Sequence, residues 1–217
     1  MHKTLIIEFL TEWQVSSGIG DGYIADNKLA RDNEGFLYIP GRAVKGALRE
    51  GATLLSRLNG RKDLVTLLET VFGTESQADK TNQSGCIRVG NAHLDSNFRN
   101  YLNGQDPKLK KGTLADLITH RAQTKLTSNK QVAEGSLRKM ECAIPFIQLE
   151  TDIDISSCVI KDKIVSDAYL EEYLMAVCAA VKSIGGDRAR GLGKCKIYFK
   201  DKGQSDVKIP AVCKEAL

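Results

Sequence analysis

The chain has 217 residues, of which 42% are hydrophobic and 27% charged, a balance typical of a folded protein and not of a disordered one. Its net charge of +4 only weakly favours an anionic partner. The opening stretch, MHKTLIIEFLTEW, lacks the apolar run and cleavage site of a signal peptide, and no later stretch is apolar enough to span a membrane. We therefore expect a cytoplasmic protein without a membrane partner, whose six cysteines are small buried residues.

The first half of the chain contains strand and helix patterns. Alternating apolar residues predict a strand over residues 3–13, and the Gly-, Asp- and Asn-rich residues 16–36 predict a long loop. Apolar residues at helical spacing then predict one helix within 38–55 and a second at roughly 62–72. Residues 85–94 are expected to form a strand.

The second half begins with a polar segment. Residues 97–140 show little apolar periodicity, and residues 141–154 return to a strand pattern. The clearest helix pattern covers 165–184, the glycine-rich residues 185–194 end it, and residues 195–199 predict a last strand.

This order of elements predicts the fold class, an α+β protein with a ferredoxin-like (RRM-like) β-α-β-β-α-β core. We expect one domain over 1–217, with the core in about 1–96 and 140–200. Residues 97–139 would be an insertion without regular structure, and residues 201–217 a C-terminal tail. A structureless stretch of that length inside a compact domain is usually functional.

The insertion is strongly basic. Residues 108–139 contain eight Lys and Arg against two acidic residues, a local excess that points to a polyanion. Arg121, Lys125 and Arg138 are candidate RNA contacts in this segment. Its isolated apolar residues Val132 and Leu137, with Leu126, are candidates to wedge between bases.

The segment GGDRARGLGK, residues 185–194, is a candidate phosphate clasp. Its glycines would let backbone amides approach an anion, and its cations would add charge. A helix C-cap and a tight turn would explain the first glycine pair but not the second. The pattern is neither a Walker loop nor a dinucleotide fingerprint. The candidate residues are Gly185, Gly186, Arg188, Arg190, Gly191, Gly193 and Lys194.

The helix within 38–55 begins with cations. Arg42, Lys45 and Arg49 oppose the helix dipole, which makes sense if an anion lies between them and the helix N-terminus. Gly46 would allow a ligand to approach closely. The alternative is a solvated basic face with a tolerated glycine.

Two motifs, YIPGRAVKGALR (38–49) and GGDRARGLGK, together resemble the RAMP superfamily, the repeat-associated RNA-binding proteins of CRISPR systems. The stretches ADNKLARDNEGFLYIPG, VFGT and AEGSLRKMECAIPF are similar to parts of the backbone subunit of type III effector complexes. Arg42 and Ala43 stand where many such subunits have two serines, which looks more like the type III-D branch.

The resemblance implies a function. Such a subunit would bind guide RNA along its backbone, form a filament with copies of itself and other type III effector subunits, and cleave complementary target RNA. It would use the insertion as a thumb. Asp26 would be the catalytic residue and a ligand of Mg²⁺ or another divalent metal, while Asp21 and Asp32 are expected to cap turns.

Other functions stay open. A paralogous subunit could hold RNA and cut nothing, because the same loop and helix would serve it. A guide-processing endoribonuclease of the superfamily would be metal-independent, but it usually has two ferredoxin-like halves and an early histidine with no clear counterpart here. Acid/base cleavage by His120 and Lys125 is a further alternative.

Overall fold

The computed structural model describes residues 1–16, 27–60, 62–74, 83–124, 127–160 and 163–202. At its centre is an antiparallel sheet with the strand order β10-β1-β7-β4-β2, to which β3 adds by pairing with β7. The strands are β1 (His2–Phe9), β2 (Tyr38–Ile39), β3 (Ile87–Val89), β4 (Ala92–Leu94), β7 (Gln148–Ile155) and β10 (Cys195–Phe199). Ile7 of β1 is paired with Ile197 of β10 on one side and with Leu149 of β7 on the other.

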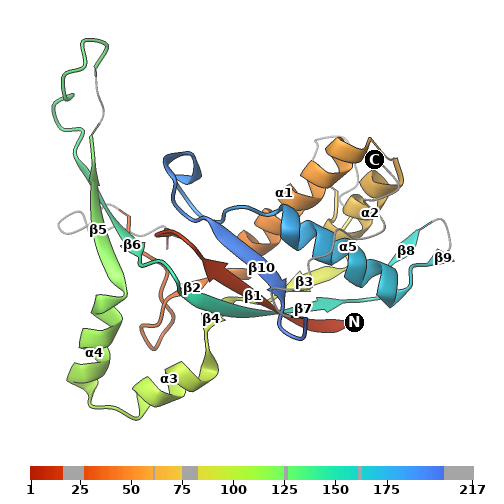
Figure 1. Cartoon of the computed structure of the whole chain (residues 1–217), viewed down its shortest axis with the longest axis horizontal. Coiled ribbons are helices and arrows are strands. Elements are labelled where there is room, and N and C mark those ends of the chain that lie inside the picture. Colours follow the sequence, from red (N-terminus) through yellow and green to blue (C-terminus); the bar gives the residue numbers. More distant parts are fainter. Residues whose placement is uncertain (17–26, 61, 75–82, 125–126, 161–162, 203–217) are drawn as a thin grey trace.

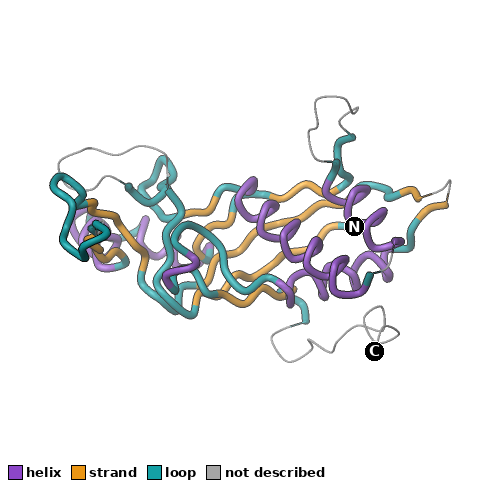
Figure 2. Tube along the Cα trace, turned by 90° about the horizontal axis from the view of Figure 1, so that it is seen from above, coloured by secondary structure: helices purple, strands orange, loops and turns teal. Residues whose placement is uncertain are grey.

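Three helices cover one face of this sheet, as Figure 2 shows from above. They are α1 (Gly41–Asn59), α2 (Lys62–Phe72) and α5 (Asp167–Ala180). Apolar residues recur at helical spacing in α1 and at every second position in β1, and both sets are buried in one core. A short hairpin of β8 (Val159–Ile160) and β9 (Lys163–Ile164) lies beyond β7. The predicted α+β, ferredoxin-like fold class is confirmed.

The insertion differs from the prediction, because most of it is regular. It contains α3 (Ser96–Asn103), α4 (Pro107–Asp116) and a two-stranded ribbon of β5 (Ile118–Gln123) and β6 (Arg138–Ala143). We call β5 and β6 the thumb ribbon; Figure 1 shows it projecting away from the sheet, with α4 leading directly into it. No residue of α4 or β5 is fully buried, so apolar periodicity could not reveal these two elements.

Three predicted strands were also too long. Residues 141–154 are divided between β6 and β7 by a turn at 144–147, where Pro145 offers no N–H to a sheet. Residues 85–94 are divided between β3 and β4 by Gly90 and Asn91. The first strand ends at Phe9, four residues earlier than predicted.

Candidate nucleic-acid interface

The glycine loop, residues 185–194, is built by close backbone packing. A Cβ atom on Gly185 would lie 2.3 Å from the carbonyl oxygen of Gln14, and one on Gly193 would lie 2.0 Å from that of Ile184. Gly186 is less strictly confined, since its Cβ would meet the Gln14 side-chain oxygen at 2.6 Å. Gly185 and Gly186 therefore let the loop pack against the segment that follows β1, and Gly193 lets the loop close against Ile184.

Several amides of the loop already have protein partners. The bonds run from Gly186 N to Gln14 O, Arg190 N to Asp187 O, Gly191 N to Arg188 O, Gly193 N to Glu12 O and Lys194 N to Thr11 Oγ1. Gly191 alone has open space around it: it ends the short helix η1 (Arg188–Arg190) at φ 85°, and no atom lies within 4 Å of its missing Cβ. A phosphate at this loop would therefore be held mainly by side chains.

The loop's arginines connect it to its neighbours. Arg188 pairs with Glu50 of α1, with Nη2 3.2 Å from Oε1, and this bond raises the pKa of the guanidinium. Arg190 pairs with Asp187 at 3.3 Å and with the Gln123 side chain of β5. The glycine loop thus bridges α1 and the thumb ribbon.

The third cation of the loop is Lys194, whose side chain is exposed. Behind it, Leu192 is 1% exposed and packs with Met140 and Cys142 of β6 in a small apolar cluster. The glycine loop is therefore docked onto the base of the thumb.

The predicted cations of α1 differ in their surroundings. Arg42 and Gly46 are exposed, and Arg49 lines a surface groove of about 360 Å³ with Glu50. Lys45 is partly committed elsewhere, because its Nζ donates to the carbonyl oxygen of Ile87 at 3.0 Å and burial lowers the pKa of its ammonium. Gly46 has no atom within 4 Å of its missing Cβ, so its face of the helix is open.

A third segment reaches the thumb base. Residues 27–31, which we call the entry segment, are held by Glu141 of β6: its amide donates to Asn27 O at 3.0 Å, and its carboxylate accepts from Leu29 N at 3.0 Å. Arg31 Nη2 lies 2.8 Å from the same carboxylate. Asp26 itself, like Asp21, lies outside the described residues.

The predicted cations of the thumb have different surroundings. Arg121 on β5 is paired with Glu12, which also accepts from Thr119 Oγ1 at 3.2 Å. Arg138 begins β6 and is exposed, opposite Gln123. His120 is exposed on β5 opposite Glu141, whereas Lys125 lies outside the described residues.

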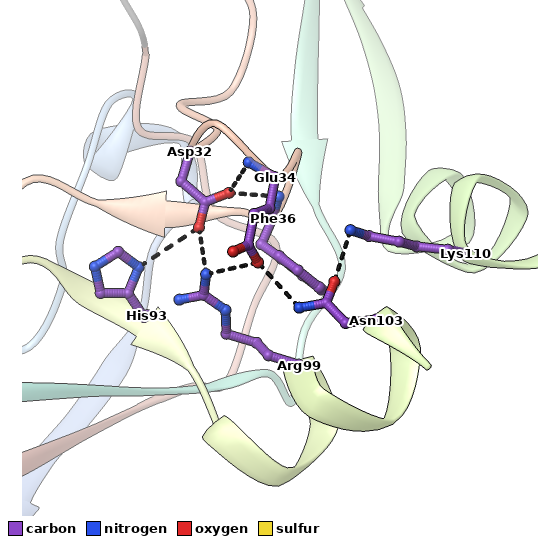
Figure 3. A network of polar contacts seen from close by, with 7 residues as sticks. All are labelled: Asp32, Glu34, Phe36, His93, Arg99, Asn103 and Lys110. Carbon is purple, nitrogen blue, oxygen red and sulfur yellow. Dashed lines mark hydrogen bonds and ion pairs between the residues drawn. The ribbon is translucent and has the colours of Figure 1, made fainter. Parts of the chain in front are cut away.

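Asp32 has the turn-capping role that the sequence predicts. Its Oδ1 accepts from the amides of Glu34 and Phe36, both at 3.0 Å, and its Oδ2 accepts from Arg99 at 2.9 Å (Figure 3). His93 Nδ1 lies 3.9 Å from the same oxygen, and burial lowers the pKa of this imidazole. This network fixes α3 against the turn at residues 32–36.

Sequence reasoning missed the remainder of the Asp32 network. Arg99 and Asn103 of α3 bind Glu34 at 3.2 and 3.1 Å, and Lys110 of α4 binds Asn103 at 2.8 Å. The helix-start signals were present in the sequence: Asp95 caps α3, and Asp106 followed by proline caps α4.

The open face of the sheet is rich in carboxylates. Along β7, Glu150, Asp152 and Asp154 alternate with buried residues, and Lys200 and His2 pair with two of them. Carboxylates repel phosphates, so the candidate interface lies at the glycine loop and not on this face.

Within the described ranges, no group of three or more His, Cys, Asp and Glu side chains is placed to hold a metal ion. In the same part of the chain, no helix combines the length and apolar character needed to cross a bilayer.

The sequence profile of the RAMP superfamily matches residues 6–196. The chain belongs to the RAMP superfamily. No curated protein matched it in a sequence search. The fold is also found in solved structures: a chain from a structure described as "Type III-B Cmr-beta Cryo-EM structure of the Apo state" is 12% identical with a TM-score of 0.66, over 96% of this chain and 99% of that one.

A second RAMP-like chain comes from the "Type III-B Cmr-beta bound to cognate target RNA". It is 11% identical with a TM-score of 0.64, over 92% of this chain and 97% of that one. At this level of identity, the two likenesses establish the fold.

Proposed function

We propose that this chain is a backbone subunit of a type III CRISPR effector complex, which binds guide RNA and cleaves complementary target RNA. The observation that carries the proposal is the convergence of three distant segments. The entry segment, which directly follows Asp26 in the sequence, and the glycine loop are both bonded to the thumb ribbon. RAMP membership and the likeness to Cmr-beta chains, one of them in a complex bound to target RNA, support this assignment. The type III-D branch stays a prediction.

Guide RNA would be held through its phosphates. Arg190, Lys194 and Arg42 are exposed cations around the glycine loop and the start of α1. Because several loop amides are occupied, side-chain charge would supply most of the grip, which makes binding strongly salt-dependent and independent of sequence. Base pairing would supply the specificity.

The resemblance to type III backbone subunits implies a divalent metal with Asp26 as its ligand. Among the described carboxylates around the thumb ribbon, Glu12, Asp187 and Glu141 are each engaged by protein partners. Mg²⁺ commonly takes one or two carboxylates together with waters and substrate phosphates. When bound, such an ion would stabilise the charge that develops on the target phosphate.

The thumb ribbon would shape the target strand. Val132 and Leu137, in the loop between β5 and β6, are 61% and 57% exposed, as expected of side chains that wedge between bases. A nucleotide pushed out of the duplex would present its 2′-hydroxyl in line with the adjacent phosphate, a geometry that A-form RNA does not offer.

A non-cleaving paralogue is the second candidate. It needs only the glycine loop and the start of α1, which would serve guide binding whether or not the chain cuts RNA. Neither candidate requires RNA to bind on the open face of the sheet.

The deciding experiment is a cleavage assay on the assembled complex. Labelled complementary RNA is added with magnesium and, in parallel, with a chelator. Evenly spaced, magnesium-dependent products support the proposal, whereas target binding without products assigns the chain to the non-cleaving paralogue. Failure to bind guide RNA contradicts both candidates.

A further inference from the structure

Phe146 is an exposed aromatic residue in the turn between β6 and β7. It exposes 75% of its surface, whereas the other five phenylalanines are buried or packed against the core. Its backbone has φ 63°, in the left-handed region that non-glycine residues rarely adopt. Two features of Phe146 are therefore unfavourable for stability: its apolar ring is exposed to water, and its backbone is strained.

The surrounding hydrogen bonds impose this conformation. The Phe146 amide donates to the carbonyl oxygen of Phe9 at 2.7 Å, and the Phe9 amide donates to Ile147 O at 3.0 Å. Glycine would occupy the same turn without strain. Backbone strain of this kind persists where the surroundings enforce it, and it clusters at functional sites.

Phe146 lies near the glycine loop. Phe146 is bonded to one side of the end of β1, at Phe9. Lys194, the last residue of the glycine loop, is bonded to the other side, because Leu10 N donates to Lys194 O at 2.8 Å. Two strand spacings of about 5 Å each place Phe146 and Lys194 about 10 Å apart. Phe146 thus lies at the same end of the sheet as Lys194, one of the candidate phosphate-binding cations.

A groove of about 570 Å³ adjoins this end. Lys182, Lys194 and Lys196 border it, and the rest of its lining is mainly apolar and includes Leu10 and Tyr198. Cations that follow the backbone and an aromatic ring that stacks on a base are the combination that binds single-stranded nucleic acid.

We propose that Phe146 stacks on an unpaired base of the RNA that the glycine loop holds. The inference rests on the proposed RNA-binding function and adds a base-contacting residue to it. The contact is independent of sequence, because every base offers an aromatic face. It adds no charge to the interface.

The test measures affinity and salt dependence with the full chain and a fluorescein-labelled single-stranded RNA. Phe146→Ala should lower the affinity about 5- to 100-fold and leave the slope against salt concentration unchanged. Phe146→Tyr keeps a ring and should bind like the wild type. Tyr101→Ala is the matched control, because it removes an aromatic residue on α3 that is 63% exposed.

Two further measurements separate stacking from other roles. Phe146→Gly should raise Tm by about 2–4 °C, because it relieves the backbone, while weakening RNA binding as Phe146→Ala does. In Phe146→Trp, RNA should quench the new fluorophore, whereas inorganic polyphosphate should not, since it has no bases. Trp13 is fully buried and gives a constant background.

Unchanged RNA affinity in Phe146→Ala, with normal wild-type binding, overturns the inference and spares the proposed function. If that variant instead loses only its association with other copies of the chain, Phe146 is a protein contact and the stacking assignment is wrong. A wild-type chain that binds no RNA contradicts the proposed function as well.

Discussion

Glu141 and Arg31 form a partly buried ion pair that joins the thumb ribbon to the entry segment. Arg31 Nη2 lies 2.8 Å from Glu141 Oε2, and the Glu141 side chain is 8% exposed. The same oxygen accepts the amide of Leu29. One carboxylate therefore fixes the course of the chain directly after Asp26.

We expect Glu141→Gln to reduce target cleavage more than guide binding. Glutamine can still accept from Leu29 N, but it loses the charge that holds Arg31, at about 1–3 kcal/mol of unfolding free energy. Denaturant unfolding and single-turnover cleavage measure the two effects. Glu134→Gln, on the exposed thumb loop, is the control and should change neither.

Asp26→Ala should retain guide binding and target capture and lose target cleavage. The residue adjoins the entry segment in the sequence, and Asn27 anchors that segment to Glu141 of β6. Single-turnover cleavage by otherwise identical complexes measures the loss. Asp21→Ala should keep most of the activity. Cleavage that survives in Asp26→Ala would assign the chemistry elsewhere.

Asp32→Ala should behave in the opposite way. It removes the acceptor of two amides and of Arg99, so it should lower the unfolding free energy by about 2 kcal/mol while retaining cleavage in the folded fraction. Thermal unfolding together with activity per folded molecule separates this variant from Asp26→Ala. A folded Asp32→Ala without cleavage would contradict the turn-capping role.

Arg190→Ala should weaken RNA binding equally for all sequences and reduce the salt slope by about one. The Arg190 side chain is 64% exposed, which suits a phosphate contact. Affinities at a series of salt concentrations measure the slope. Lys200→Ala, which removes a cation from the open face of the sheet, is the matched control. If both variants show the same dependence of RNA affinity on salt concentration, Arg190 does not contact the RNA phosphates.

The two later glycines of the loop should differ in their tolerance of alanine. Gly193→Ala should cost about 3 kcal/mol or more, because its Cβ would lie 2.0 Å from a backbone oxygen. Gly191→Ala meets no neighbouring atom and should cost about 1 kcal/mol for its φ of 85°. Chemical denaturation measures both, and similar losses would contradict the packing role of Gly193.

Acidification should destabilise the chain through His93. Burial and Arg99 lower the pKa of this imidazole, so the unfolded state takes up the proton first. The stabilisation is complete above the unfolded pKa of about 6.5 and is lost as the pH falls toward the folded value. His93→Gln should flatten the dependence of Tm on pH in this window, and an unchanged slope would exclude His93 as its source.

The sequence could predict the core because the core obeys periodicity. The helical spacing in α1 and α5 and the alternation in β1 describe one apolar face each, and burial follows that face. The insertion escaped for the same reason, since α4 has no buried residue and its helix rests on its cap and proline start. Strand ends depended on single residues such as Pro145.

For the candidate site, the sequence could predict the types of residue involved but not their contacts. GGDRARGLGK indicated glycines and cations, but the sequence could not show that Gly185 and Gly193 pack against the backbone and that Arg188 bridges to Glu50. The pairing of Glu141 with Arg31 spans 110 residues, a distance over which no local pattern carries information. Such contacts are set by the tertiary fold.

The contacts between the glycine loop and the thumb ribbon have a thermodynamic consequence. Gln123 binds Asp187 at 3.0 Å, and Leu192 packs on Met140, so the loop and the ribbon cannot move independently. If a neighbouring molecule bends the ribbon, it changes the loop's affinity for its ligand, and the ligand must change the neighbour's affinity by the same factor. Assembly and ligand binding would then be cooperative along a row of subunits without any contact between one ligand-binding loop and the next.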